Sequence, residues 1–246
     1  AWLTAAVDSR VSAIAPIVFD FLNWEDQMPH QFASFGDYLP ALADYTNAGV
    51  FDSLDTPEGQ ALLDIIDPYR YLGRLTMPKI LINGTGDQFF ASDAARCYFD
   101  DLPGDNLLNY VPNTDHGLGN GTEAMATFSA FYASFLYGVD IPQVHGSFHN
   151  GVIHVYSSIA PVSAVLWRAQ NPSGRDFRVS TLQSLGEAWQ SEPLTPTLAG
   201  VYRADAPVPE QGWSAWYVQL TYSHPLGGSY NLSSQIYIVP DIYPAQ

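Results

Sequence analysis

Two short apolar runs, each followed by a turn with a titratable side chain, constrain the fold of this chain more than any other feature. The first run covers residues 78–84 and leads through a Gly-Thr-Gly turn to Asp87. The second covers residues 107–111 and leads to His116, 29 positions after Asp87. Runs of this length and composition are typical of buried parallel strands. The sequence therefore predicts an acid and a histidine on turns beyond the ends of two neighbouring strands, with a helix between them.

An acid followed by a histidine in this setting is how an α/β-hydrolase presents the last two members of its catalytic triad, because the chain order in that fold is nucleophile, acid, histidine. The nucleophile belongs on a Gly-x-Ser-x-Gly elbow before Asp87, and no such elbow occurs here. Residues 1–8 resemble the helix that follows the elbow. We therefore expect a C-terminal part of a hydrolase whose serine lies in a missing N-terminal segment of the same protein, and we expect this chain alone to be inactive.

The catalytic roles follow from the chemistry of a serine triad. The histidine takes the proton of the nucleophile, and the acid fixes its tautomer and stabilises the imidazolium. Asp87 and His116 are the predicted pair. Asp20, which ends the preceding apolar run, is the rival acid. Weaker candidates for substrate contacts are Trp24, Met28 and Phe89.

Composition excludes several classes of function. The 246 residues carry 9 basic and 25 acidic side chains, for a formal charge of −16, which disfavours nucleic-acid binding because that needs clustered Lys and Arg. No run approaches the roughly 18 apolar residues of a membrane span. Cys97 is the single cysteine, and the histidines lack ligand spacing. We expect no metal, no cofactor and no disulfide, and an unidentified ester or amide substrate.

The first predicted domain covers residues 1–143. Residues 11–19 are apolar and suit a central strand, although Pro16 cannot donate to a ladder. Residues 21–75 carry helical patterns without a strand pattern, and we interpret them as a cap inserted over the active site. A helix is predicted at the end of the inserted segment, where Thr56 is of a residue type preferred at the N-terminus of a helix. Further helices are predicted at residues 92–101 and 122–137.

The second predicted domain covers residues 144–246. Helical spacing disappears near residue 140, and alternation of apolar and polar residues takes over, for example along 152–157 and 215–222. Turn signals recur between these runs. Short strands at such spacing predict an antiparallel immunoglobulin-like β-sandwich with a core of its own. The predicted fold class is therefore α/β, a partial α/β-hydrolase sheet with a helical cap, followed by a β-sandwich.

Short motifs in both halves of the chain carry a family resemblance. They are Trp2-Leu3-Thr4-Ala5-Ala6-Val7-Asp8, Arg10-Val11, Ala13-Ile14-Ala15-Pro16-Ile17-Val18, Asp67-Pro68-Tyr69, Arg74-Leu75-Thr76-Met77-Pro78-Lys79, Tyr110-Val111-Pro112-Asn113, Leu166-Trp167-Arg168-Ala169, Arg175-Asp176-Phe177-Arg178 and Val239-Pro240-Asp241. Together they resemble the PhoPQ-activated pathogenicity-related proteins over nearly the whole chain.

This resemblance implies an α/β-hydrolase body, an immunoglobulin-like β domain and a secreted or periplasmic location. It also implies a Gly-Ala-Ser-Lys-type elbow just before the segment at which this sequence starts. Because the elbow is absent, neither the nucleophile nor the oxyanion donors carry over, whereas Asp87 and His116 stand at matching positions. Two functions remain open. One is a serine hydrolase, and the other is a secreted signalling or binding protein that keeps the scaffold without turnover.

Overall fold

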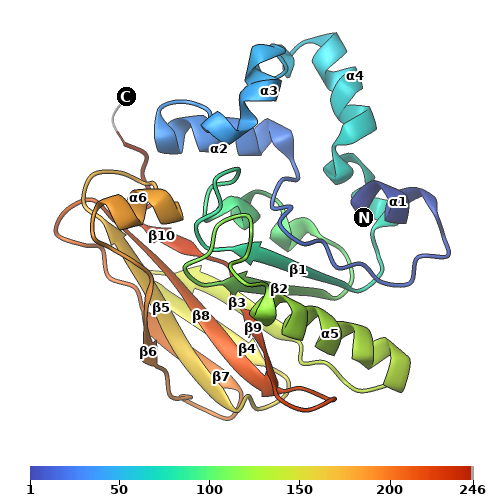
Figure 1. Ribbon diagram of the computed structural model, residues 1–246, viewed down its shortest axis with the longest axis vertical. Helices are drawn as coiled ribbons and strands as arrows, with labels where there is room; N and C mark the ends of the chain where they lie inside the picture. The colour runs from blue at the N-terminus through green and yellow to red at the C-terminus, as the bar shows by residue number, and fades with distance from the viewer. Residues whose placement is uncertain (245–246) are drawn as a thin grey trace.

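The computed structural model describes residues 1–244 and has a mixed α and β architecture with three sheets (Figure 1). A parallel pair of strands, β1 (Lys79–Gly84) and β2 (Asn106–Val111), lies in the middle of the molecule. The two strands are in register along their whole length, so their carboxyl ends at Gly84 and Val111 are level. The loops that follow them therefore start side by side.

Residues 11–19, predicted as a third strand, run parallel to β1 on the side away from β2 but form only isolated bridges with it. Pro16 explains the broken ladder, because its ring nitrogen has no hydrogen to donate. The carbonyl of Pro16 still accepts a hydrogen bond from the backbone of Ile82 at 3.0 Å. Within the described residues this segment forms the open edge of the parallel sheet.

Helices lie above the parallel strands in Figure 1. The first, α1 (Trp2–Val7), ends at Asp8 as predicted. Residues 21–75 then contain helices and, in the described structure, no strand, so the predicted helical content is confirmed while the role of a cap stays a prediction. These helices are α2 (Trp24–Phe35), η1 (Pro40–Leu42), α3 (Ala43–Asn47), η2 (Phe51–Ser53), α4 (Pro57–Ile66) and η3 (Pro68–Arg74). Thr56 caps α4 by accepting a hydrogen bond from the backbone of Gly59 at 3.1 Å.

The prediction of a helix over residues 92–101 is wrong. Two short 3-10 turns, η4 (Ala94–Cys97) and η5 (Phe99–Asp101), occupy this stretch. Ser92, the first residue of this stretch, donates its hydroxyl to the carbonyl of Thr85 at 2.7 Å. The carbonyl of Cys97 is also diverted, since it accepts from the side chain of Asn23. These tertiary bonds hold the segment against its neighbours in place of a continuous helical ladder.

The C-terminal half is dominated by antiparallel strands that follow α5 (Thr122–Tyr137). One sheet has the order β3 (Val144–His149), β4 (Val152–Ser157) and β7 (Val201–Asp205). The other has the order β10 (Tyr237–Val239), β8 (Trp213–Ser223), β5 (Ser163–Asn171) and β6 (Gln190–Pro193), with β9 (Ser229–Ser233) also paired to β8. A short helix, α6 (Val179–Ser184), lies between β5 and β6.

The expectation that the β half has a core of its own is wrong. One apolar cluster contains Ile82 of β1 and Phe131 of α5 together with Val218 of β8. Polar contacts join the halves as well, because Tyr110 of β2 donates its backbone N–H to Oγ of Ser233 at 3.1 Å. Side chains of the β half thus form hydrogen bonds with backbone groups at the outer edge of β2. The two halves therefore share this cluster, whereas the predicted boundary near residue 144 stays a prediction.

Candidate functional site

The structure brings Asp87 and His116 together at the carboxyl ends of β1 and β2. Nδ1 of His116 lies 2.8 Å from Oδ2 of Asp87. The Asp87 side chain is 4% exposed, whereas that of His116 is 32% exposed. A buried carboxylate that holds the inner nitrogen of a solvent-accessible imidazole is the geometry of an oriented general base. The predicted contact is therefore present, and the catalytic role of the pair stays a prediction.

Local hydrogen bonds fix both members of the pair. The backbone N–H of Phe89 donates to Oδ1 of Asp87 at 2.7 Å, which leaves Oδ2 directed at the histidine. Burial raises the pKa of Asp87, while this N–H and the His116 ring act in the opposite direction. The backbone N–H of His116 donates to Oε1 of Gln88 at 3.1 Å. The residue after Asp87 therefore also links the two loops.

Aromatic side chains surround the imidazole. The ring of Phe89 lies 4.5 Å from the ring of His116, measured between centroids, and that of Phe90 lies 6.0 Å away. Phe90 in turn packs against Phe19 at 6.4 Å, and Phe19 is 36% exposed at the end of the open-edge segment. The imidazole therefore has apolar aromatic side chains beside it.

The glycines before Asp87 serve close approach of the backbone. Neither Gly84 nor Gly86 has a positive φ. A Cβ atom on Gly84 would lie 2.6 Å from the carbonyl oxygen of Asp115, and one on Gly86 would lie 2.5 Å from the backbone nitrogen of Val179. The Asp87 loop is thus pressed between the His116 loop and the start of α6, so a side chain at either glycine would push the loops apart.

The rival acid, Asp20, is engaged elsewhere. Its carboxylate accepts hydrogen bonds from the hydroxyls of Tyr98 and Tyr110, the latter at 2.7 Å. Asp20 is only 2% exposed. Both carboxylate oxygens of Asp20 therefore accept hydrogen bonds from tyrosines, and the acid in contact with His116 is Asp87.

Asp20 should make folding stability depend on pH. Burial raises the pKa of Asp20 to about 7 against the opposing effect of the two tyrosine hydroxyls, so folding favours the protonated carboxyl. The resulting stability is fully present below the ordinary pKa of an aspartate and is lost as pH rises through about 7. We expect wild-type protein to lose several kcal/mol relative to Asp20→Asn between about pH 4 and about pH 8. Urea unfolding at both pH values measures this difference, and parallel curves for wild type, Asp20→Asn and the exposed control Asp140→Asn would contradict it.

The weaker sequence candidates separate into two groups. Trp24 and Met28 are 4% and 1% exposed and belong to the core of the helical segment, together with Phe51 and Leu63. Their burial opposes direct contact with a substrate, because both pack against other side chains of this core. Phe89 is half-buried beside His116 and remains a candidate for substrate contact.

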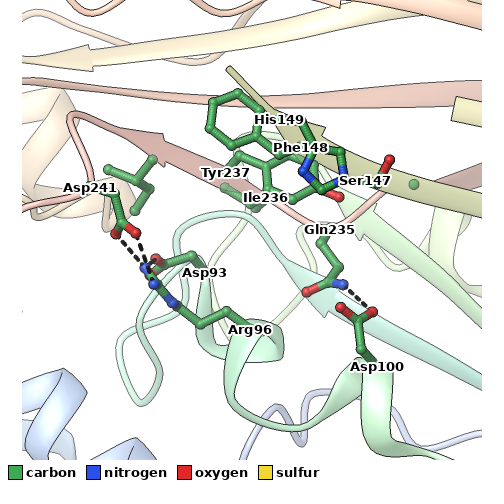
Figure 2. Close-up of a pocket in the computed structure, with 12 residues that line it drawn as sticks. Asp93, Arg96, Asp100, Ser147, Phe148, His149, Gln235, Ile236, Tyr237 and Asp241 are labelled. Atoms are coloured by element: carbon green, nitrogen blue, oxygen red, sulfur yellow. Dashed lines mark hydrogen bonds and ion pairs between the residues drawn. The ribbon is translucent and has the colours of Figure 1, made fainter. Parts of the chain in front are cut away.

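A buried ion network near the pair was missed by sequence reasoning. Asp93, in the loop that also carries Asp87, lies 3.0 Å from Nε2 of His30 on α2 and 2.8 Å from Nη2 of Arg175. Burial alone raises the pKa of Asp93, but the charges of His30 and Arg175 hold it well below its usual range. Arg96 and Asp241 form a further pair at 2.7 Å next to Asp93, at the wall of a cavity of about 320 Å³ (Figure 2). The one sequence signal for this network was the motif Arg175-Asp176-Phe177-Arg178, which contributed to the family resemblance.

Among residues 1–244 no group of three or more His, Cys, Asp and Glu side chains is arranged to hold a metal ion. Over the same residues, none of the helices has both the length and the apolar character needed to cross a membrane.

Comparison with known proteins identifies relatives of this chain. A family model described as PhoPQ-activated pathogenicity-related protein matches residues 1–178, a range that includes Asp87 and His116. Autocrine proliferation repressor protein A of Dictyostelium discoideum is 30% identical over 267 aligned residues, which cover 99% of this chain and 54% of that protein. The chain therefore spans about half the length of this curated relative.

Proposed function

We propose that this chain, which belongs to the PhoPQ-activated pathogenicity-related protein family, carries the acid and the base of a serine hydrolase that acts on an ester or an amide. The observation that carries the proposal is the 2.8 Å contact between the buried Asp87 carboxylate and the partly exposed His116 ring. The serine comes from a part of the protein outside these 246 residues.

In this mechanism His116 takes the serine proton on Nε2 as the hydroxyl attacks the substrate carbonyl, and later gives it to the leaving group. Asp87 keeps the proton of the neutral ring on Nδ1 and stabilises the imidazolium that forms. The hydrogen bond from Phe89 N–H holds the carboxylate in place during both steps. The ring of Phe89, packed on the imidazole, contacts the apolar part of the substrate.

The proposal includes an α/β-hydrolase body, an immunoglobulin-like β domain and a secreted or periplasmic location. The open edge at residues 11–19 supports a further strand beside it. Backbone groups alternate in direction along a strand, and those of residues 14 and 18 face β1. The groups of residues 13, 15 and 17 therefore face the other way, where a parallel strand carrying the nucleophile would satisfy them.

A second candidate function is a signalling or binding protein that keeps the scaffold without turnover. The observation that favours it is the name of the Dictyostelium discoideum relative, which describes repression of proliferation rather than hydrolysis. Fold alone does not separate these functions. Retention of the Asp87–His116 contact favours the hydrolase, because a scaffold without turnover has no need of an oriented base.

Activity measurements on two lengths of protein separate the candidates. We expect the complete protein to hydrolyse activated esters or anilides and the 246-residue chain alone to be inactive, because loss of a triad nucleophile costs roughly 10⁶-fold in kcat. His116→Ala in the complete protein is the control. Turnover by the isolated chain, or turnover by the complete protein that survives His116→Ala, would contradict the hydrolase proposal. A complete protein without turnover would favour the signalling function.

A further inference from the structure

The connection between β5 and β6, residues 172–189, contacts both loops of the Asp87–His116 pair. It contains α6 and belongs to the β half of the chain. Its first half packs against its last residue, because the rings of Phe177 and Trp189 lie 6.3 Å apart. Trp189 is 3% exposed and also packs against Tyr217 of β8 at 5.3 Å. The connection is therefore anchored in an apolar cluster that the two halves of the chain share.

The loop that carries Asp87 is held at two points by the first half of this connection. On one side of the acid, the backbone N–H of Val179 donates to the carbonyl of Gly86 at 3.1 Å. On the other side, the fully buried Arg175 guanidinium binds Asp93 at 2.8 Å. Asp87 lies between these two attachments in the sequence. The connection therefore constrains the position of the Asp87 backbone.

The loop that carries His116 is held by the other end of the connection. The side chain of Asn113 pairs with the backbone of Trp189 in both directions, donating from Nδ2 at 2.9 Å and accepting at Oδ1 at 2.8 Å. Asn113 adopts the left-handed conformation with φ 56°. Its own backbone N–H donates to Oγ1 of Thr85 at 2.9 Å, which ties the same residue to the Asp87 loop.

We propose that residues 172–189 are a positioning element of the active site, and that Asn113, bound to Trp189, holds His116 in register with Asp87. The inference rests on the proposed function, because only a catalytic pair needs this register. Each loop has its own attachment to one packed connection, so the connection constrains their separation in addition to the direct bonds between the loops. Asn113 acts through the loop backbone and does not touch the reacting atoms. The β half thus contributes to catalysis without supplying a catalytic residue.

Asn113→Gly tests the role with little disturbance of the backbone, because glycine adopts positive φ freely and keeps the bond to Thr85. Asn150→Gly is the matched control, since Asn150 also has a left-handed conformation, with φ 52°, in the turn between β3 and β4. In the complete protein we expect Asn113→Gly to lower kcat roughly 10²-fold with KM little changed. Asn150→Gly should match wild type. Equal rates for Asn113→Gly and wild type would overturn the proposal.

Nitrogen NMR of ¹⁵N-histidine-labelled protein gives a readout that does not need turnover. Wild type should show His116 as a fixed tautomer with the proton on Nδ1, and Asn113→Gly should show averaging of the two ring nitrogens. Unchanged His116 signals in the variant would overturn the positioning role even if activity fell. If wild type shows no hydrolysis, the proposed function fails, and the NMR comparison still decides the positioning role.

Asn113→Asp covers the case in which the glycine variant does not fold. Aspartate tolerates the left-handed conformation and keeps the acceptor for Trp189 N–H, but it loses the donor to the Trp189 carbonyl. We expect a smaller loss of kcat, on the order of 10-fold, with partial averaging of the His116 tautomer. Wild-type rate and wild-type spectra for this variant would again overturn the proposal.

Discussion

If the complete protein is the proposed hydrolase, we expect Asp87→Asn to lower its kcat for ester hydrolysis by about 10⁴-fold, the size of loss seen for the corresponding change in a serine protease triad. Asparagine keeps the shape of the side chain and its bond from Phe89 N–H. Its amide, however, presents a donor to Nδ1 of His116, which moves the ring proton to Nε2. A protonated Nε2 cannot accept the proton of the serine, so the base is lost while substrate binding, and with it KM, changes little.

Asp115→Asn is the matched control for this prediction. Asp115 is adjacent to His116 in the sequence, but its side chain is exposed and accepts only the backbone N–H of Gly117, at 2.9 Å. We expect a change of less than about 3-fold, since an exposed charge is well screened. Steady-state kinetics on both variants distinguishes a specific role of Asp87 from a general effect of removing a negative charge near the histidine. Similar losses in the two variants would contradict the assignment of the acid.

Arg175→Met is expected to give the largest loss of stability, about 3–5 kcal/mol in the free energy of unfolding. The substitution leaves Asp93 as a buried carboxylate whose remaining partners are the His30 ring and the more distant Arg96 guanidinium. Removing one partner of a buried pair is costly because the remaining charge stays out of water without compensation. The loss should appear as a lower urea midpoint.

Arg203→Met provides the comparison. Arg203 lies on β7, is 53% exposed and pairs with Asp205 at 3.2 Å. Exposed ion pairs contribute about 0–1 kcal/mol, so this variant should unfold close to wild type. If the two arginine variants lose the same small amount of free energy of unfolding, the buried Arg175–Asp93 pair does not stabilise the fold.

The Asp87–His116 contact was predictable because it depends on two local patterns and one general rule. Each residue follows an apolar run, and the carboxyl ends of neighbouring parallel strands lie at the same edge of a sheet. Register then brings the two loops together without further information. The helix that begins after Thr56 was predictable for a similar reason, since the capping residue and the following proline are adjacent in the sequence.

The parts that could not be predicted depend on long-range contacts. Arg175 and Asp93 are 82 positions apart, and Asn113 and Trp189 are 76 apart, so neither pair leaves a local pattern. The failed helix at residues 92–101 has the same origin, because tertiary bonds to this segment override its helical spacing. The shared core was missed because alternation along a strand shows which side chains are buried but not which neighbours bury them.

Labelling with a fluorophosphonate probe tests the central claim most directly, because such probes react with serines that an oriented base activates. We predict that the complete protein is labelled on one serine outside residues 1–246, identified by peptide mapping, and that His116→Ala and Asp87→Asn abolish the labelling while Asp115→Asn does not. A folded complete protein that is not labelled, or is labelled equally in the His116→Ala variant, would contradict the claim that Asp87 and His116 form the acid and base of a hydrolase.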